Sequence, residues 1–449
     1  MKSIWTAETK IRNRESLPGD IDTEALVIGG GLAGILTAYY LKQAGIDTVV
    51  LEADRIGSGQ TKNTTAKITS QHGLIYDRLL RTLGSKKAEQ YARANENAID
   101  EYEKLIREKE IDCDFVRCPA CLYSREEETL LKREAEAAAK LGIKASFEQT
   151  DGGLPFYVTG ITKFEDQARF HPLKFLERIA EELTVYERTT VLKVEGGRAK
   201  TDRGNVTARQ IVFAAHFPFM NIPGYYFARM YQERSSVIAL EGADIPESMY
   251  LGIDKNGLSF RPQGEKLLLG GGSHRTGVNK KGGQYENLLK QARLLYPGCK
   301  ESACWSAQDC MTLDGIPYIG RFSEKRPNWY VATGFGKWGM TSAMVSAWIL
   351  TALITGRECP EAAVFSPARH LTAQAAGQLV CHGAHTVKGL AGHLLPAGDT
   401  DIIPNCPHMG CRLKYNPDEE SFDCPCHGSR FDKEGRLLDG PAQTDCRKK

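Results

Sequence analysis

The sequence predicts an α/β fold with a small cysteine- and histidine-rich module at its C-terminal end. Three observations carry this prediction: a strand-like run that enters a glycine-rich turn near the N-terminus (24–54), a second glycine-rich turn that enters a long apolar segment (329–357), and two clusters of cysteine and histidine between positions 405 and 432. A chain of 449 residues is long enough for two or three domains with a substantial core.

The composition is typical of a soluble globular protein, with 25% charged and 41% hydrophobic residues. The net charge is +2 and no basic block is present, which argues against nucleic-acid binding. The first twenty residues lack the apolar run of a signal peptide. The longest apolar stretch, 340–356, contains Thr and Ser and is too short to span a membrane, so we expect a buried helix there. These features predict a cytoplasmic protein with no transmembrane segment.

Residues 24–54 predict a strand, a tight turn, a helix and a second strand. Gly29, Gly31 and Gly34 have the Gly-x-Gly-x-x-Gly spacing that provides a tight turn, close backbone approach to a pyrophosphate, and close helix–strand packing. The N-terminus of the following helix favours phosphate, because its amides are free and its dipole is positive there. Glu52 ends the second strand at the distance expected for a carboxylate that binds ribose hydroxyls. The sequence therefore predicts a dinucleotide site, to which we also assign Leu32, Ala33 and Ala53.

The segment that follows, 55–73, distinguishes FAD from NAD. It is a long Gly/Ser/Thr-rich loop with almost no apolar content, and "LEADRIGSG" with this loop resembles the glycine/D-amino-acid oxidase (DAO) family of flavin enzymes. In that family the loop passes under the isoalloxazine ring, so the resemblance implies FAD, with Thr64 and Thr65 among the residues that bind it.

A second part of the resemblance lies at 314–321 and 329–357, which are similar to the closing motif of the DAO family. There a strand delivers a glycine-rich turn to a helix whose N-terminus faces the flavin. Amides at such a helix start would stabilise negative charge on a reduced flavin. The resemblance implies that this turn and helix start bind FAD through Gly334, Gly336, Gly339, Met340 and Thr341.

The resemblance continues through 164–183 and 206–219 and implies a Rossmann-like FAD-binding domain with a mixed-sheet substrate domain. Helical composition at 76–111 and 126–143, and a strand ending near 267–277, are assigned to the substrate side. The expected oxidoreductase domain is 1–370, with FAD-binding parts at about 22–75, 162–222 and 305–370, and substrate-side parts at about 76–161 and 223–304.

The candidate catalytic residues are Lys67, His274, Arg275 and Trp338. Lys67 lies in the loop expected under the flavin, where a cation can stabilise reduced flavin or hold the FAD phosphates. For His274 and Arg275 the functional interpretation is a contact to a substrate carboxylate or a leaving proton, and the alternative is a solvated loop. His72 and Lys337 are further candidates. Flavin chemistry often needs no strong acid or base, because the cofactor supplies the reactivity.

Cys118 and Cys121 form a Cys-x-x-Cys pair in an apparent strand. No helix begins at the second cysteine, as a thioredoxin-like site requires, so we interpret the pair as structural. His171, His216 and the other scattered cysteines are interpreted as packing residues.

Near the C-terminus, Cys406 and His408 form Cys-x-His, and Cys424 and His427 form Cys-x-x-His. Two thiolates and two imidazoles can hold zinc tetrahedrally, so zinc is one interpretation. The surrounding "CPHMGC" and "CPCHGSRFD" closely resemble the Rieske family. That resemblance implies a [2Fe–2S] cluster, in which the two cysteines bind one iron and the two histidines bind the other.

The Rieske resemblance also implies a disulfide between Cys411 and Cys426, for which two free thiols are the alternative. Ser429 matches a serine that donates a hydrogen bond to a cluster sulfide. Phe431 stands where high-potential members have tyrosine, so a lower potential is expected. The expected module, 401–449, is small, all-β and shortened at its base, follows a linker at 371–400, and would rest on the flavin domain.

Together the two resemblances imply a flavin enzyme with its own iron–sulfur centre. Its substrate would be a small amine, an amino acid or a related molecule, and electrons would pass singly from FAD to the cluster and on to an external protein or quinone. A dehydrogenase is then favoured over an oxidase. The alternatives are reverse electron flow into a flavin reductase, a redox sensor without turnover, and a zinc-stabilised binding module.

Overall fold

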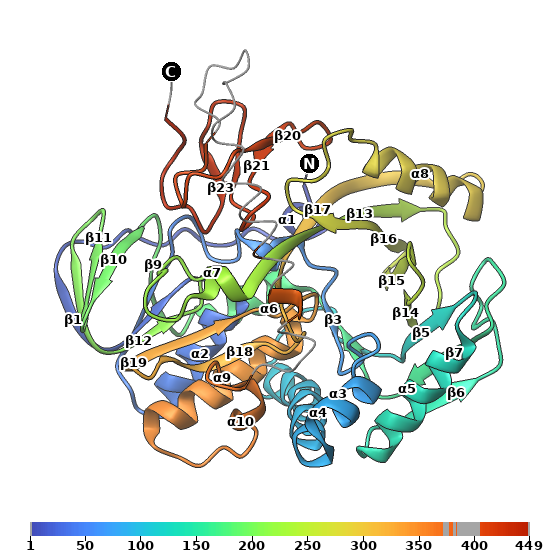
Figure 1. The fold of residues 1–449 in the computed structure, drawn as a ribbon, viewed down its shortest axis with the longest axis horizontal. Coiled ribbons are helices and arrows are strands. Elements are labelled where there is room, and N and C mark those ends of the chain that lie inside the picture. The colour runs from blue at the N-terminus through green and yellow to red at the C-terminus, as the bar shows by residue number, and fades with distance from the viewer. Residues whose placement is uncertain (1, 371–376, 380–382, 384–404, 448–449) are drawn as a thin grey trace.

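The computed structural model of the protein describes residues 2–370, 377–379, 383 and 405–447. Two large sheets form the body of the molecule, and a small four-stranded sheet near the C-terminus lies on top of them in the view of Figure 1. The linker expected at 371–400 falls almost entirely outside the described residues.

The first large sheet has a parallel centre in the order β9-β2-β1-β12-β19. The last four residues of β1 and all of β2 are buried, as expected for strands covered on both faces. Helices α2 and α9 pack against each other beside this sheet (Figure 1). The bounds are β1 (Ile21–Ile28), β2 (Thr48–Leu51), β9 (Thr184–Tyr186), β12 (Asn205–Phe213), β19 (Arg326–Thr333), α2 (Leu32–Gln43) and α9 (Gly339–Thr355).

Antiparallel strands extend this sheet, and short elements surround it. β12 pairs with β11 along its first half and with β19 along its second half, while β18 pairs with β19. The bounds are β10 (Val191–Glu195), β11 (Arg198–Thr201), β18 (Tyr318–Ser323), α1 (Ile4–Glu8), α6 (Pro172–Ala180), α7 (Tyr226–Arg229), α10 (Ala362–Phe365) and the 3₁₀ turn η1 (Gln60–Asn63). A separate small sheet joins β3 (Lys67–Ile68), β8 (Ala168–Arg169) and β4 (Val116–Arg117).

The second large sheet is mixed, in the order β17-β13-β16-β15-β14-β5-β7-β6. The long strands β13 and β17 pair along most of their length and reach the C-terminal module. The bounds are β5 (Ala120–Ser124), β6 (Ala145–Glu148), β7 (Gly160–Phe164), β13 (Met230–Glu241), β14 (Met249–Gly252), β15 (Ser259–Gln263), β16 (Lys266–Arg275), β17 (Lys300–Thr312), α3 (Tyr76–Leu83), α4 (Ser85–Glu108), α5 (Glu128–Lys140) and α8 (Gln284–Leu295).

The C-terminal module is a meander of four short antiparallel strands, β20 (Lys414–Asn416), β21 (Ser421–Asp423), β22 (Arg430–Phe431) and β23 (Leu437–Asp439). Its small core consists largely of cysteines packed around Leu413 and Phe431. Together with the two large sheets, this module confirms the expected fold class: an α/β flavin-type domain, a mixed-sheet substrate side and a small all-β unit.

The apolar stretch at 340–356 forms helix α9, which is buried along most of its length. Within the described part of the chain, no helix combines the length and apolar character needed to cross a membrane.

Candidate functional site

The turn between β1 and α2 is built by close backbone contacts that only glycine permits. A Cβ at Gly34 would lie 1.9 Å from the carbonyl oxygen of Gly29, and a Cβ at Gly29 would lie 2.5 Å from the carbonyl oxygen of Ala214. Gly29 also has φ +115°, a backbone angle that would strain any other residue type at this position. At Gly31 the nearest atom to a Cβ is 3.5 Å away, the hydroxyl of Thr61. The turn is therefore packed on its protein side and open at Gly31, which suits a pyrophosphate.

Glu52 follows β2 and its carboxylate points back to this turn. Oε2 accepts a 2.6 Å hydrogen bond from the Gly30 amide, and Oε1 accepts one from the Asp54 amide at 2.9 Å. Burial raises the pKa of Glu52, although these two amide donors oppose the shift. The carboxylate is thus held at the end of β2, where a ribose hydroxyl could reach it.

A cavity of about 1390 Å³ opens from this turn and runs to the start of α9. It is lined by many of the residues expected to bind FAD or substrate, including Gly29, Gly31, Leu32, Ala33, Glu52, Ala53, Thr64, Thr65, Lys67, Gly336, Trp338, Gly339 and Met340. The cavity thus joins the two glycine-rich turns, although they are about 300 positions apart in the sequence. A long cleft of this shape, with a helix start at each turn, fits FAD.

Three expected FAD residues, Gly34, Gly334 and Thr341, are not among the described cavity-lining residues. Gly34 packs against the carbonyl oxygen of Gly29. Gly334 lies at φ +73° in the turn before α9. The Thr341 hydroxyl is buried and bonds to the carbonyl oxygen of Thr69 and the ring of His72. These residues shape the walls instead of facing the cavity.

Lys67 reaches the cavity from β3. Its Nζ donates hydrogen bonds to the Tyr250 carbonyl oxygen at 3.0 Å and the Ser259 hydroxyl at 2.7 Å. Burial lowers the pKa of Lys67 to about 7, and the charge of Arg261 adds to the shift. The neutral amine is therefore accessible near neutral pH, as a proton acceptor requires.

Trp338 lines the cavity, whereas His72 lies behind it. The two rings stack with centroids 4.8 Å apart, and His72 also bonds to the Tyr91 hydroxyl. Burial lowers the pKa of His72 to about 3, so the ring is neutral. Lys337 lines the cavity and pairs with Glu233 at 3.5 Å.

His274 and Arg275 are not among the described residues that line the cavity, and Arg275 lies against the C-terminal module. Its guanidinium donates to the carbonyl oxygens of Pro425 and Cys426, each at 3.2 Å. His274 Nδ1 contacts the carbonyl oxygen of Gly272. Their position at the end of a strand suggested a substrate contact, but Arg275 instead bonds to the docked module.

The cavity wall also contains residues that the sequence did not assign to the site, among them Asp309 and His216. No sequence motif marks Asp309, and His216 was expected to be a packing residue. Burial raises the pKa of Asp309 to about 7, opposed by Lys337 and supported by Glu233. A single acidic residue within a strand gives no motif, so only the fold could identify it.

Cys118 and Cys121 are both buried and neither forms a disulfide. Burial raises the pKa of Cys121 to about 12, which disfavours its thiolate. This environment fits the structural interpretation of the pair.

The C-terminal module presents two similar loops. In the first, the Cys406 amide bonds to the Cys411 carbonyl oxygen at 2.9 Å, and in the second the Cys424 amide bonds to the Ser429 carbonyl oxygen at 2.8 Å. The neighbouring thiol of Cys424 lowers the pKa of Cys406. The Ser429 hydroxyl adds to this shift. Both thiols and the serine thus converge on one point.

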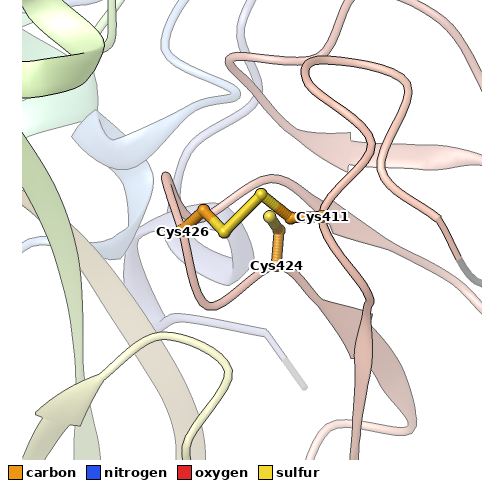
Figure 2. A group of neighbouring side chains, drawn as sticks. All are labelled: Cys411, Cys424 and Cys426. Atoms are coloured by element: carbon orange, nitrogen blue, oxygen red, sulfur yellow. A yellow bond between two sulfur atoms is a disulfide. The ribbon is translucent and has the colours of Figure 1, made fainter. Parts of the chain in front are cut away.

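Cys411 and Cys426 form the expected disulfide, with Cα atoms 6.6 Å apart (Figure 2). The sulfurs of Cys411, Cys424 and Cys426 lie within 4.8 Å of one another. Because two of them are covalently joined, these three cannot form a metal site by themselves. The disulfide instead links the two loops and leaves Cys424 free to act with Cys406.

The histidines complete the site. The rings of His408 and His427 are perpendicular with centroids 4.9 Å apart. His408 Nε2 bonds to Asn221, while its buried Nδ1 has no hydrogen-bond partner within the described residues. Burial lowers the pKa of His408 to about 4, which favours the neutral ring that a metal needs. Two thiols and two imidazoles at adjacent loops fit a [2Fe–2S] cluster of mixed ligation.

The module docks on β13 and β17 through buried polar contacts. Gln232 Nε2 donates to the carbonyl oxygen of His427 at 2.6 Å, and Gln308 Nε2 donates to that of Gly428 at 2.9 Å. Gln308 also donates to Gln232 Oε1 at 2.8 Å. In the same interface, buried Arg234 pairs with Glu419. These contacts hold the second cluster loop against the mixed sheet.

The module also forms part of the cavity wall. Residues 437–443, which include β23 and the turn after it, line the cavity together with the flavin-side turns. Gln60, in the loop expected under the flavin, donates to Asp439 at 3.0 Å, and Gln443 donates to the carbonyl oxygen of Val191 at 2.7 Å. The Ala442 amide in turn donates to the Ser429 hydroxyl beside the cluster cysteines. The cavity and the cluster site therefore share one wall.

Comparison with known proteins agrees with this geometry. Residues 24–353 match the model of the FAD dependent oxidoreductase (DAO) family, and residues 402–448 match the Rieske [2Fe-2S] domain. The chain is 35% identical to the Rieske 2Fe-2S iron-sulfur protein YhfW of Bacillus subtilis, over 98% of this chain and 96% of that protein. It is 23% identical to gamma-glutamylputrescine oxidoreductase of Escherichia coli, over 76% of this chain and 86% of that protein.

Among solved structures, glycine oxidase from Geobacillus kaustophilus superposes with a TM-score of 0.66 at 19% identity, covering 78% of this chain and 99% of that one. This likeness supports the flavin-type fold of the body. The Rieske match identifies the group expected in the C-terminal module as an iron–sulfur cluster instead of zinc. The chain therefore belongs to the DAO family of FAD-dependent oxidoreductases and carries a C-terminal Rieske [2Fe–2S] domain.

Proposed function

We propose that this protein oxidises a small amine, amino acid or related molecule at FAD and passes the electrons singly to its own Rieske cluster and on to an external acceptor. One observation carries the proposal: residues 437–443 of the cluster module line the flavin cavity. A cluster module that forms part of the cavity wall supports electron exchange between the two cofactors. FAD supplies a two-electron hydride acceptor, and the cluster supplies a one-electron carrier.

The protein's own groups in this reaction are those of the cavity walls. The start of α9, at Gly339 and Met340, lines the cavity, and its backbone amides would stabilise negative charge on a reduced flavin. Lys67 Nζ would take the proton that a protonated amine must lose before its C–H bond can deliver a hydride. Its lowered pKa makes this transfer feasible near pH 7. Trp338 contributes an apolar wall that excludes water from the same region.

A small polar substrate suits the substrate-side wall. Lys337 lies there with Ser235 and Ser273, both within hydrogen-bond reach of its Nζ, and Asp309 lies close by on β17. A cation beside an acid of raised pKa can orient a molecule that carries both an anionic and a basic group. This is the support for an amine or amino acid as the substrate class.

We further propose that the enzyme is a dehydrogenase with an external one-electron acceptor. Because the cluster module forms part of the cavity wall, reduced flavin could pass its electrons to the cluster without oxygen. The acceptor would be a protein or a quinone that meets the module from outside.

The test is anaerobic mixing of the holoenzyme with a panel of small amines and amino acids, followed by flavin absorbance and low-temperature EPR. The expected result is bleaching of the flavin together with the rhombic signal of a reduced cluster. A Cys424→Ser variant, which removes one cluster ligand, should still bleach but give no such signal. Bleaching by a substrate without cluster reduction in the wild-type protein would contradict the electron transfer. A cluster potential well below that of the flavin would instead favour the reverse direction.

A further inference from the structure

Asn221 of the flavin domain contacts the ring of a cluster ligand. This residue lies in the segment between β12 and α7, and its Oδ1 is 2.8 Å from Nε2 of His408. A carboxamide oxygen can only accept, so Nε2 carries the proton. The other ring nitrogen, Nδ1, is buried and has no hydrogen-bond partner within the described residues. This bond therefore selects the tautomer whose Nδ1 lone pair is free to bind iron.

The second histidine lies against the same segment. The ring of His427 meets the rings of Phe217 and Phe227 edge-on, with centroids 6.3 and 5.9 Å away. Phe217 also lines the flavin cavity. The imidazole side of the cluster thus faces the flavin domain of its own chain. That domain makes a polar, directional contact with the ring of His408 and apolar contacts with the ring of His427.

We propose that Asn221 is a positioning residue for the cluster: by accepting the Nε2–H of His408, it fixes the ring and lowers the midpoint potential of the cluster. A hydrogen-bond acceptor on the outer nitrogen makes an imidazole a stronger electron donor to its metal, which stabilises the oxidised cluster. The same bond occupies the N–H that an external molecule would need in order to hydrogen-bond to His408. This inference deepens the proposed function, because it concerns the carrier that would receive the flavin's electrons.

The test is an equilibrium redox titration of the holoenzyme at fixed pH, with the cluster followed by EPR and the flavin by absorbance. It needs neither substrate nor turnover, so its outcome is independent of the proposed reaction. Asn221→Ala is expected to raise the cluster potential by an amount equivalent to at least about tenfold in the reduced-to-oxidised ratio, or ~59 mV for one electron. Asn221→Asp, which retains an acceptor of the same shape, is expected to leave the potential at or below the wild-type value.

The control is Asn97→Ala, at an exposed position of α4 on the far side of the molecule from the module (Figure 1). It should leave both potentials unchanged. A wild-type cluster potential in Asn221→Ala would overturn the inference. In that case a lowered potential in Asn221→Asp would reflect only the added negative charge. If Asn221→Ala loses its cluster, retention in Asn221→Asp supports the inference, and loss in both variants overturns it.

Discussion

Gln308 and Asp309 are consecutive residues of β17 that face different partners. Gln308 Nε2 donates to the Gly428 carbonyl oxygen in the second cluster loop, whereas Asp309 lines the flavin cavity. Successive side chains of a strand point to opposite faces, so one strand separates the two cofactor sites. The cluster module and the flavin cavity thus contact adjacent residues of the same strand, β17.

Asp309 is expected to make the flavin potential depend on pH near neutrality. Its pKa is raised to about 7, so the carboxyl is neutral below that pH and negative above it. A negative charge at the cavity wall disfavours an anionic reduced flavin. The charged groups around it are Lys337 and Arg234, which stabilise the carboxylate, and Glu233, which opposes it. The wild-type flavin potential should therefore fall below that of Asp309→Asn as pH rises through about 7.

The measurement is spectroelectrochemical titration of both proteins between pH 5.5 and 8.5. The two potentials should coincide at the acid end and separate above pH 7. Glu301→Gln, the same carboxyl-to-amide change at the exposed end of β17, serves as the control. A constant offset between wild type and Asp309→Asn at every pH would show that the residue does not titrate in this range.

Gln308→Leu should weaken the docking of the cluster module. The substitution leaves the Gly428 carbonyl oxygen and the Gln232 side chain without their buried partner, which costs about 1–3 kcal/mol of the free energy of unfolding. Denaturant unfolding measures this, and the rate of cluster reduction by photoreduced flavin should fall in parallel. Gln291→Leu, at an exposed position of α8, is the control and should alter neither quantity. An unchanged stability of Gln308→Leu would mean that water replaces the lost contacts.

Glu419→Gln should be more damaging, because Glu419 joins two buried guanidinium groups. It pairs with Arg234, whose side chain is 2% exposed, and with Arg430, whose side chain is 7% exposed. Removing one partner of a buried ion pair leaves an uncompensated charge and costs about 3–5 kcal/mol. The exposed pair Lys144–Asp166 offers the comparison, since Asp166→Asn should not change the melting temperature. Equal melting temperatures for the two variants would show that the interface admits water.

Lys67 is expected to set the pH dependence of flavin reduction. Because its pKa is lowered to about 7, the amine is protonated below that pH and neutral above it. If Lys67 accepts the substrate proton, the rate of flavin reduction rises as pH increases through about 7 and then levels off. Lys67→Met should abolish this rise and lower the rate on the order of 10²-fold.

Stopped-flow reduction with a substrate found in the panel provides the measurement for Lys67. Lys255→Met, which removes an exposed lysine of the same cavity, should retain the rise with pH. A rise that persists in Lys67→Met would assign the titration to another group.

The disulfide between Cys411 and Cys426 should stabilise the module and its cluster. It closes a loop of 15 residues between the two cluster loops, for which the chain-entropy treatment gives ~3 kcal/mol. The double variant Cys411→Ala/Cys426→Ala should lose its EPR signal faster on incubation in aerobic buffer than the wild type. Cys359→Ala, which removes a free cysteine, is the control. Equal cluster lifetimes would show that the polar docking contacts suffice to hold the loops.

Much of the fold and of both cofactor sites could be predicted because their signals are local. Gly29 and Gly34 are neighbours in sequence and in space, and their spacing alone specifies a turn that no larger residue fits. The Cys-x-His and Cys-x-x-His clusters are also local, and their resemblance to the Rieske family implied the disulfide that the structure contains. Helices at 76–111 and 126–143 appear as α3, α4 and α5, because amphipathic periodicity is also a local property.

The orientation of individual side chains could not be predicted in the same way. We expected Lys67 in the loop under the flavin, and His274 and Arg275 at the end of a strand in contact with substrate. Arg275 nevertheless bonds to the cluster module, and Lys67 lines the cavity. Which face of a strand meets a cavity depends on what packs against the other face, and that information is distributed over distant residues.

The sequence by itself therefore indicated the two cofactors, through the resemblance of its short nucleotide and cluster motifs to the DAO and Rieske families. Only the tertiary structure decided how the two sites meet. The bond from Gln232 to His427 joins residues 195 positions apart, and the bond from His408 to Asn221 joins residues 187 positions apart. A single glutamine or asparagine cannot be recognised as a site residue in the sequence, because its hydrogen-bond partner is known only once folding has buried the two residues together.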